Sequence, residues 1–214
     1  MNKGTTNLFK ELLERYPSLE NSKHDIQEAL NILIEGYNKG KKILICGNGG
    51  SAADSEHISG ELLKGFMQKR TCTQKDMKNL SKFGEDGTYI CENLQRGIKA
   101  IPLPSLSSSI TAYLNDSQPD LIYAQLVYAL GESGDILLAI STSGNSKNTY
   151  LAGIVAKSLN MKVIGLSGET GGKLNSISDV CIKAPENETF KIQELHLPIY
   201  HFLCAGMESE LFED

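Results

Sequence analysis

The sequence lacks any long hydrophobic run. Its first twenty residues include charged side chains such as Lys3, Glu11 and Arg15 and contain no apolar stretch, which argues against a secretory signal. No later segment reaches the roughly 20 apolar residues that a membrane-spanning helix needs. We therefore expect a soluble protein with no membrane partner.

The sequence also has no basic cluster and no closely spaced cysteine pair. Twenty-six acidic and 21 basic residues give a net charge of -5 and are spread along the chain, which argues against a nucleic-acid partner. The cysteines are odd in number and none are in C-x-x-C spacing, so a reducing cytoplasm is the expected location. They are Cys46, Cys72, Cys91, Cys181 and Cys204.

What is present is a repeated unit of apolar strand, turn and helix. The 214 residues are 40% hydrophobic, enough for one sizeable core, and predict a single domain over residues 1–214. Strands separated by helices of this length predict a mainly parallel sheet covered on both faces, an α/β doubly wound three-layer sandwich. The predicted strands span residues 42–46, 135–140, 162–166 and 180–182.

Helices are predicted at both ends of this unit. Residues 1–40 have apolar positions at helical spacing and predict a pair of amphipathic helices, and the chain from Thr189 onward predicts one long helix. Residues 67–98 are polar and contain glycine, which predicts an excursion from the core. We interpret that segment as an insertion.

Two turns that follow predicted strands are the first candidate site. Parallel strands end at one edge of a sheet, so the loops 47–51 and 141–146 are expected to lie side by side. The second loop can surround a phosphate with hydroxyl and N–H groups and without a lysine. Its hydroxyls belong to Ser141, Thr142, Ser143 and Ser146. The alternative is structural, because any tight turn favours glycine and Ser51 with Asp54 fits a helix capping box.

Potential metal ligands lie on the segments nearest to these loops. His57 and Glu61 are four residues apart on the predicted helix, so they share a face and can hold a metal ion or a substrate hydroxyl. An ordinary solvated pair is the alternative reading. The final helix adds Gln193, Glu194, His196 and His201.

Three motifs together resemble those of the phosphoheptose isomerases, a group of the sugar isomerase (SIS) domain family. They are CGNGGSAAD at 46–54 followed by His57 and Glu61, LAISTSGNS at 138–146, and IQELH at 192–196. The resemblance extends from about residue 8 to residue 210. It implies an SIS-type fold and an enzyme.

The resemblance also implies roles for individual residues. The implied Zn²⁺ ligands are His57, Glu61, Gln193 and His201, with Gln193 also touching substrate. Glu61 matches the catalytic base and His201 the acid. The implied phosphate contacts are Ser51, Ser141, Ser143 and Ser146. Positions that line the sugar are Asn48, Gly49, Gly50, Asn115 and Asp116.

The implied reaction converts sedoheptulose 7-phosphate to D-glycero-D-manno-heptose 7-phosphate through an enediol, an early step in making heptose for surface glycans. The resemblance also implies a homotetramer with active sites at subunit interfaces. Two alternatives remain: a non-catalytic SIS protein that binds a sugar phosphate or the replication initiator, and an isomerase of another sugar phosphate. A binding protein has no need of the complete zinc and proton-transfer set, which favours an enzyme.

Overall fold

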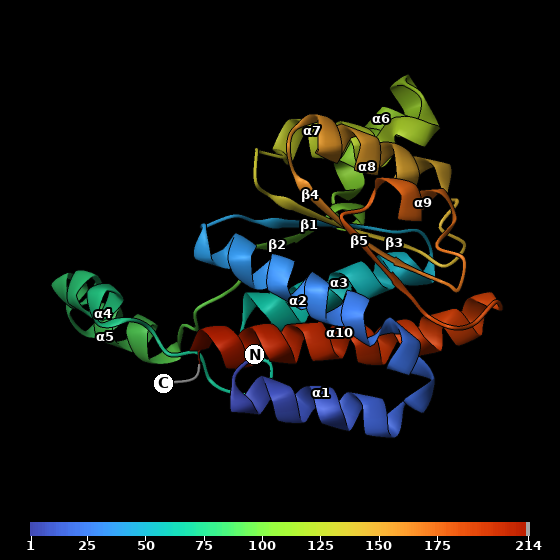
Figure 1. The fold of residues 1–214 in the computed structure, drawn as a ribbon. Helices are drawn as coiled ribbons and strands as arrows, with labels where there is room; N and C mark the ends of the chain where they lie inside the picture. The colour runs from blue at the N-terminus through green and yellow to red at the C-terminus, as the bar shows by residue number, and fades with distance from the viewer. Residues whose placement is uncertain (213–214) are drawn as a thin grey trace.

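A five-stranded parallel sheet forms the centre of the computed structural model, which describes residues 1–212 (Figure 1). The strand order is β2-β1-β3-β4-β5. The strands are β1 (Ile43–Cys46), β2 (Ala100–Pro102), β3 (Ile136–Ser141), β4 (Lys162–Ser167) and β5 (Val180–Lys183). The predicted fold class is therefore confirmed. The edge strand β2 was not predicted, because three residues that end in proline show no strand periodicity.

Helices cover both faces of the sheet. In Figure 1, α6, α7, α8 and α9 lie on one side, while α2, α3 and α10 lie on the other with α1 packed outside α10. The helices are α1 (Lys3–Arg15), α2 (Lys23–Asn38), α3 (Gly50–Leu63), α4 (Gln74–Leu80), α5 (Gly84–Asn93), α6 (Ser107–Asp116), α7 (Ile122–Leu130), α8 (Lys147–Ser158), α9 (Gly172–Ile177) and α10 (Thr189–Phe212). Across residues 1–212, none of these helices has the length and apolar composition to cross a bilayer.

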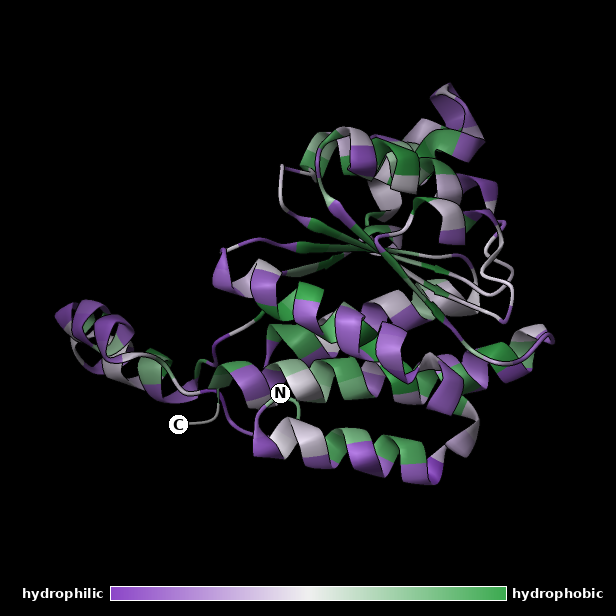
Figure 2. Cartoon of the chain, in the orientation of Figure 1, coloured by the Kyte–Doolittle hydropathy of each residue, from purple (hydrophilic) through white to green (hydrophobic). Residues whose placement is uncertain are grey.

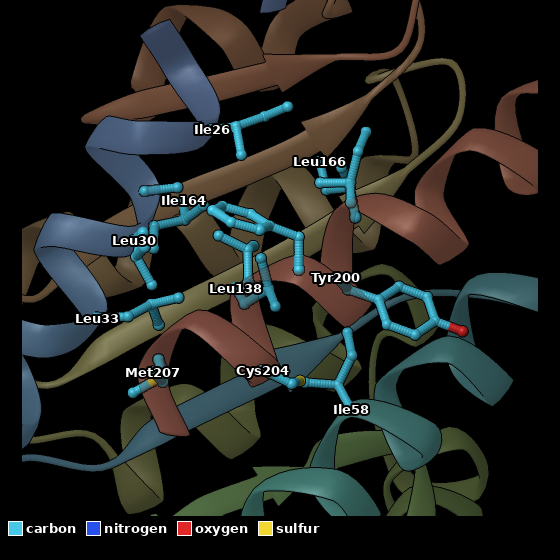
Figure 3. Close-up of a cluster of buried hydrophobic side chains, with 14 of the residues drawn as sticks. Ile26, Leu30, Leu33, Ile58, Leu138, Ile164, Leu166, Tyr200, Cys204 and Met207 are labelled. Atoms are coloured by element: carbon cyan, nitrogen blue, oxygen red, sulfur yellow. The ribbon is translucent and has the colours of Figure 1, made fainter. Parts of the chain in front are cut away.

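The sheet separates two hydrophobic cores. Every residue of β3 is buried, and Ile136, Leu138 and Ile140 face the α2–α10 side while Leu137 and Ala139 face the α7–α8 side. This alternation is the period of a strand whose two faces are both covered. Figure 2 shows the apolar residues gathered on the faces that meet the sheet, and Figure 3 shows the core on the α10 side.

The segment predicted as an excursion forms the helical hairpin α4–α5, which projects from the body in Figure 1. A capping box at Thr73 and Asp76 begins α4. The hairpin leaves Phe83 71% and Tyr89 68% exposed, so it contributes little to either core. Its status as an insertion stays a prediction.

A buried carboxylate anchors the chain at the base of this hairpin. Glu208 of α10 accepts a hydrogen bond from Arg70 Nε at 2.7 Å. It also accepts from the backbone N–H groups of Phe66, Met67 and Gln68 at 2.8, 2.7 and 3.1 Å. Both charged side chains are almost fully buried, at 0% and 2% exposure. The pair therefore fixes the end of α3 and the start of the excursion against α10.

His196 gives the fold a pH dependence. Its ring is fully buried in α10, with Nε2 3.2 Å from the carbonyl oxygen of Ser167. Burial lowers the pKa of His196 from 6.5 to about 4. Between these two pH values the unfolded chain binds a proton at His196 that the folded chain does not. The contribution of the neutral, buried ring to the free energy of unfolding is therefore fully present above pH 6.5 and is lost as the pH falls from 6.5 toward 4.

Because of this residue, we expect the free energy of unfolding to be about 2 kcal/mol lower at about pH 5 than at about pH 7. Urea unfolding at both pH values measures the loss. The variant His196→Leu should lose less stability over the same interval, whereas the exposed control His24→Gln should behave like the wild type. An undiminished loss in His196→Leu would assign the effect to other groups.

Candidate active site

The two predicted loops meet at the carboxyl edge of the sheet. β1 and β3 are neighbours, with Cys46 opposite Ala139, so the turns that follow them leave the sheet together. The side-chain amides of Asn48 and Asn148 then bond to each other in both directions at 2.9 Å, which ties the first loop to α8. The hydroxyl of Tyr123 holds the first loop from the α7 side by donating to Gly47 O at 2.6 Å.

The glycines of the first loop are required by space and by backbone conformation. A Cβ on Gly47 would lie 2.7 Å from Ser51 Cβ, and Gly49 has a φ of +56°. Gly49 is the N-cap of α3 and no side chain caps this helix. The capping-box alternative for Ser51 and Asp54 is therefore wrong, and Ser51 is a buried residue in the first turn of α3.

The second loop gathers hydroxyls at the start of α8. Ser141 is buried and its Oγ donates to Ser146 Oγ at 3.1 Å, while Ser143 Oγ accepts from the backbone N–H of Asn145 at 3.1 Å. Ser143 is exposed and Thr142 is half-buried at the open side of this loop. The positive end of the α8 dipole adds attraction for an anion at this point. The arrangement is chemically suited to a phosphate, and the phosphate-binding role of these serines stays a prediction.

The next lysine along the chain does not take part in this loop. Lys147 Nζ pairs with Asp120 Oδ2 at 2.5 Å, toward the turn that precedes α7. The hydroxyl and backbone N–H groups of the loop can bind an anion without Lys147.

Three of the predicted ligands come together between α3 and α10. His57 Nε2 lies 3.3 Å from Glu61 Oε1, and the His57 and His201 rings meet edge to face with centroids 5.1 Å apart. The His57 side chain is 43% exposed and Glu61 is 18% exposed. Burial is the main cause that lowers the pKa of His201, and the neighbouring His57 adds to the effect while Glu61 opposes it.

Gln193 lies at the glycine loop and two helical turns from His201. A Cβ on Gly50 would be 2.4 Å from Gln193 Nε2, so this amide covers the start of α3. Eight residues of helix separate Gln193 from His201, which is about 12 Å of rise. The structure thus places Gln193 beside Gly50 and leaves its predicted role as a fourth ligand a prediction.

Asn115 and Asp116 lie apart from these groups. They are exposed at the end of α6, on the other side of the sheet from α3 and α10, and Asn115 Nδ2 donates to Asp116 Oδ1 at 2.8 Å (Figure 1). Among residues 1–212, no hydrogen bond or ion pair joins them to His57, Glu61 or His201. Their sugar-lining role stays a prediction.

Comparison with known proteins identifies the family. The model of the SIS domain matches residues 7–95 and 96–168. A phosphoheptose isomerase from Helicobacter pylori is 39% identical over 203 residues, which cover 93% of each chain. Another, from Helicobacter hepaticus, is 39% identical over 88% of this chain and 84% of its own length.

The chain belongs to the phosphoheptose isomerase group of the SIS domain family. A solved structure of a phosphoheptose isomerase from Francisella tularensis matches it with a TM-score of 0.75 and 29% identity, covering 95% of this chain and 96% of the other. The predicted family, fold and enzyme class, a sugar-phosphate isomerase, are confirmed.

The clustered side chains fit a zinc ion in donor type. Imidazole nitrogens and a carboxylate oxygen are ordinary zinc ligands, and three protein ligands with an open position are typical of catalytic zinc sites. His57, Glu61 and His201 supply these donors on adjacent helices. Within residues 1–212, no three His, Cys, Asp or Glu side chains stand close enough to enclose a metal as they are. Binding would have to draw them together.

Four residues around the site were missed by sequence reasoning. Asp54 lies inside a motif that was recognised and Asn148 follows the serine loop directly, so their positions carried a signal. Tyr123 and Tyr200 carried none, because each reaches the site from a helix more than 70 residues away along the chain.

Proposed function

We propose that this enzyme interconverts sedoheptulose 7-phosphate and D-glycero-D-manno-heptose 7-phosphate through an enediol, with zinc as its metal. The observation that carries the proposal is that His57 of α3 contacts both groups: its Nε2 lies 3.3 Å from Glu61 Oε1, and its ring meets that of His201 on α10 at 5.1 Å between centroids. The names of its relatives support the choice of sugar phosphate.

Glu61 and His201 have suitable chemistry for moving protons between two neighbouring carbons. Glu61 takes the proton from C1 while the carbonyl oxygen on C2 receives a proton from His201, which gives the enediol. Return of a proton to C2, with loss of the proton on O1, leaves the carbonyl at C1.

We assign zinc binding to His57, Glu61, Gln193 and His201. Zinc, when bound there, supplies polarisation of the carbonyl and stabilises negative charge on the sugar oxygens. The ring of His57 would favour metal binding by its fixed orientation, because the hydroxyl of Tyr200 already lies 3.0 Å from its Nδ1.

The serine loop is proposed to bind the phosphate of the substrate. Ser51, Ser141, Thr142, Ser143 and Ser146 are the proposed contacts, and Asn48, Gly49, Gly50, Asn115 and Asp116 are proposed to line the sugar. Phosphate binding far from the reacting carbons supplies energy that positions C1 and C2.

Ser143→Ala is expected to raise KM about 10- to 100-fold with a small effect on kcat, because one hydrogen bond to a charged phosphate is lost in both ground and transition states. Steady-state kinetics measure the two constants separately. Ser158→Ala at the far end of α8 is the matched control. An unchanged KM in Ser143→Ala would place the phosphate elsewhere.

A homotetramer with active sites at subunit interfaces is proposed as the working assembly. In the single chain, His201 lines a cavity of about 420 Å³ between α1 and α10, together with Leu8, Phe66 and Leu197. Leu197 is 41% exposed at this cavity. A second subunit that covers this region would bury the apolar wall beside the site, and light scattering of the purified protein measures the assembly.

The deciding experiment is turnover of sedoheptulose 7-phosphate by the zinc-loaded protein, with the product identified by NMR. Formation of the aldoheptose phosphate supports the proposal. Turnover of ketohexose or ketopentose phosphates alone would assign another sugar. Binding of a sugar phosphate with no turnover of any of them would favour the non-catalytic alternative.

A further inference from the structure

The side of His57 that faces the protein interior is held by a buried polar contact. Tyr200 is 1% exposed in the α10 core, and Figure 3 shows its hydroxyl pointing out of the apolar cluster. That hydroxyl lies 3.0 Å from His57 Nδ1 and 3.3 Å from Asp54 Oδ1. Asp54 and His57 are both on α3, so Tyr200 of α10 bridges two side chains on the same helix.

The hydrogen-bond donors and acceptors of Tyr200, Asp54 and His57 determine where the protons of these three side chains lie. A tyrosine hydroxyl has one proton and lone pairs that accept. Asp54 Oδ2 is buried without a partner within residues 1–212, and Tyr200 is the side chain that bonds the other oxygen. An ionised Asp54 therefore takes the Tyr200 proton, since this half-buried carboxylate would otherwise have no hydrogen-bond partner among residues 1–212.

The direction of the second bond follows from the first. Once the Tyr200 proton is directed to Asp54, the tyrosine oxygen can only accept from His57, so Nδ1 carries the hydrogen. A neutral His57 then has its lone pair on Nε2, the nitrogen that faces Glu61 Oε1 at 3.3 Å.

We propose that Tyr200, oriented by Asp54, is a positioning residue that fixes His57 in the Nδ1–H tautomer and presents its Nε2 lone pair to the open site beside Glu61. A nitrogen lone pair and a carboxylate oxygen repel at this distance unless a cation or a proton donor lies between them. The pair is thus set to receive a metal ion or a substrate hydroxyl.

The inference rests on the proposed function only where it concerns zinc and turnover. Its first test is independent of both: nitrogen NMR of the imidazole groups in the metal-free protein, at a pH where His57 is neutral. The wild type should show the Nδ1–H tautomer at His57. Tyr200→Phe removes one oxygen and should return His57 to the Nε2–H form that free histidine prefers.

Asp54→Ala separates orientation from simple packing. It keeps the Tyr200 hydroxyl but frees its proton to turn toward His57 Nδ1, so the Nε2–H tautomer is expected here too. Tyr37→Phe, which alters a tyrosine packed against Phe212, is the matched control and should leave His57 unchanged. If Tyr200→Phe does not fold, Asp54→Ala still decides the point. An Nε2–H form in the wild type, or one tautomer in all variants, overturns the proposal.

Zinc affinity provides the second test. Chelator competition should show zinc bound about 10- to 100-fold more weakly by Tyr200→Phe than by wild type or Tyr37→Phe, the usual cost of losing a partner behind a metal ligand. Equal zinc affinity in these proteins would overturn the role toward the metal. Absence of heptose turnover with the expected tautomers would instead count against the proposed substrate and leave the positioning role intact.

Discussion

Glu61→Gln is expected to lower kcat for sugar-phosphate isomerisation by about 10²- to 10⁴-fold, the usual contribution of a positioned general base. The amide keeps the shape of the side chain and cannot take a proton from carbon. Glu61 is only 18% exposed and its Oε1 lies 3.3 Å from His57 Nε2, so its position is defined. Because the proposed phosphate site is the serine loop and not Glu61, KM should change much less than kcat.

The control for this prediction is Glu56→Gln on the same helix. Glu56 is exposed and accepts a hydrogen bond from Ser105 Oγ at 2.8 Å, away from His57 and His201. Its kcat should remain within about twofold of wild type. Steady-state assays with zinc-saturated proteins measure both variants, and metal analysis of each sample separates a lost base from a lost ligand. A Glu61→Gln enzyme with nearly normal kcat at full zinc occupancy would require another base.

Features of the site that depend on local sequence could be predicted. His57 and Glu61 share a face because helical spacing places them there, and the glycine and serine loops follow apolar strands that a parallel sheet aligns. These signals span fewer than about twenty residues each. Sheet topology then brings the loops together, as the Asn48–Asn148 amide pair shows.

Features that depend on pairs far apart in the chain could not be predicted. Tyr200 reaches His57 across 143 residues and Arg70 reaches Glu208 across 138, and neither pair has a periodic signature. The same limit applies to β2, whose three residues become a strand only because β1 offers its edge. Position along the chain also gave no sign that α6 would carry Asn115 and Asp116 to the far side of the sheet from the histidines.

Among the long-range pairs that the sequence did not predict, Arg70 and Glu208 are expected to have the largest effect on stability. Glu208→Ala should lower the free energy of unfolding by about 3–5 kcal/mol, because it leaves the Arg70 guanidinium buried without its partner. Three backbone N–H groups at residues 66–68 lose their acceptor in the same change. Urea unfolding of the purified protein measures the difference.

A double-mutant cycle distinguishes a buried pair from general loss of packing. The double variant Arg70→Leu/Glu208→Leu should lose much less free energy of unfolding than the summed losses of the single variants Arg70→Leu and Glu208→Leu. In the double variant no uncompensated charge remains in the interior. An exposed ion pair gives the matched control: Asp120→Ala removes the partner of Lys147 and should cost below about 1 kcal/mol. Additive effects in the Arg70 and Glu208 cycle would mean that the two charges do not stabilise each other. The anchor of the α4–α5 hairpin would then rest on the backbone hydrogen bonds to Glu208 and on those that Arg70 donates to the carbonyl oxygens of Glu61 and Leu62.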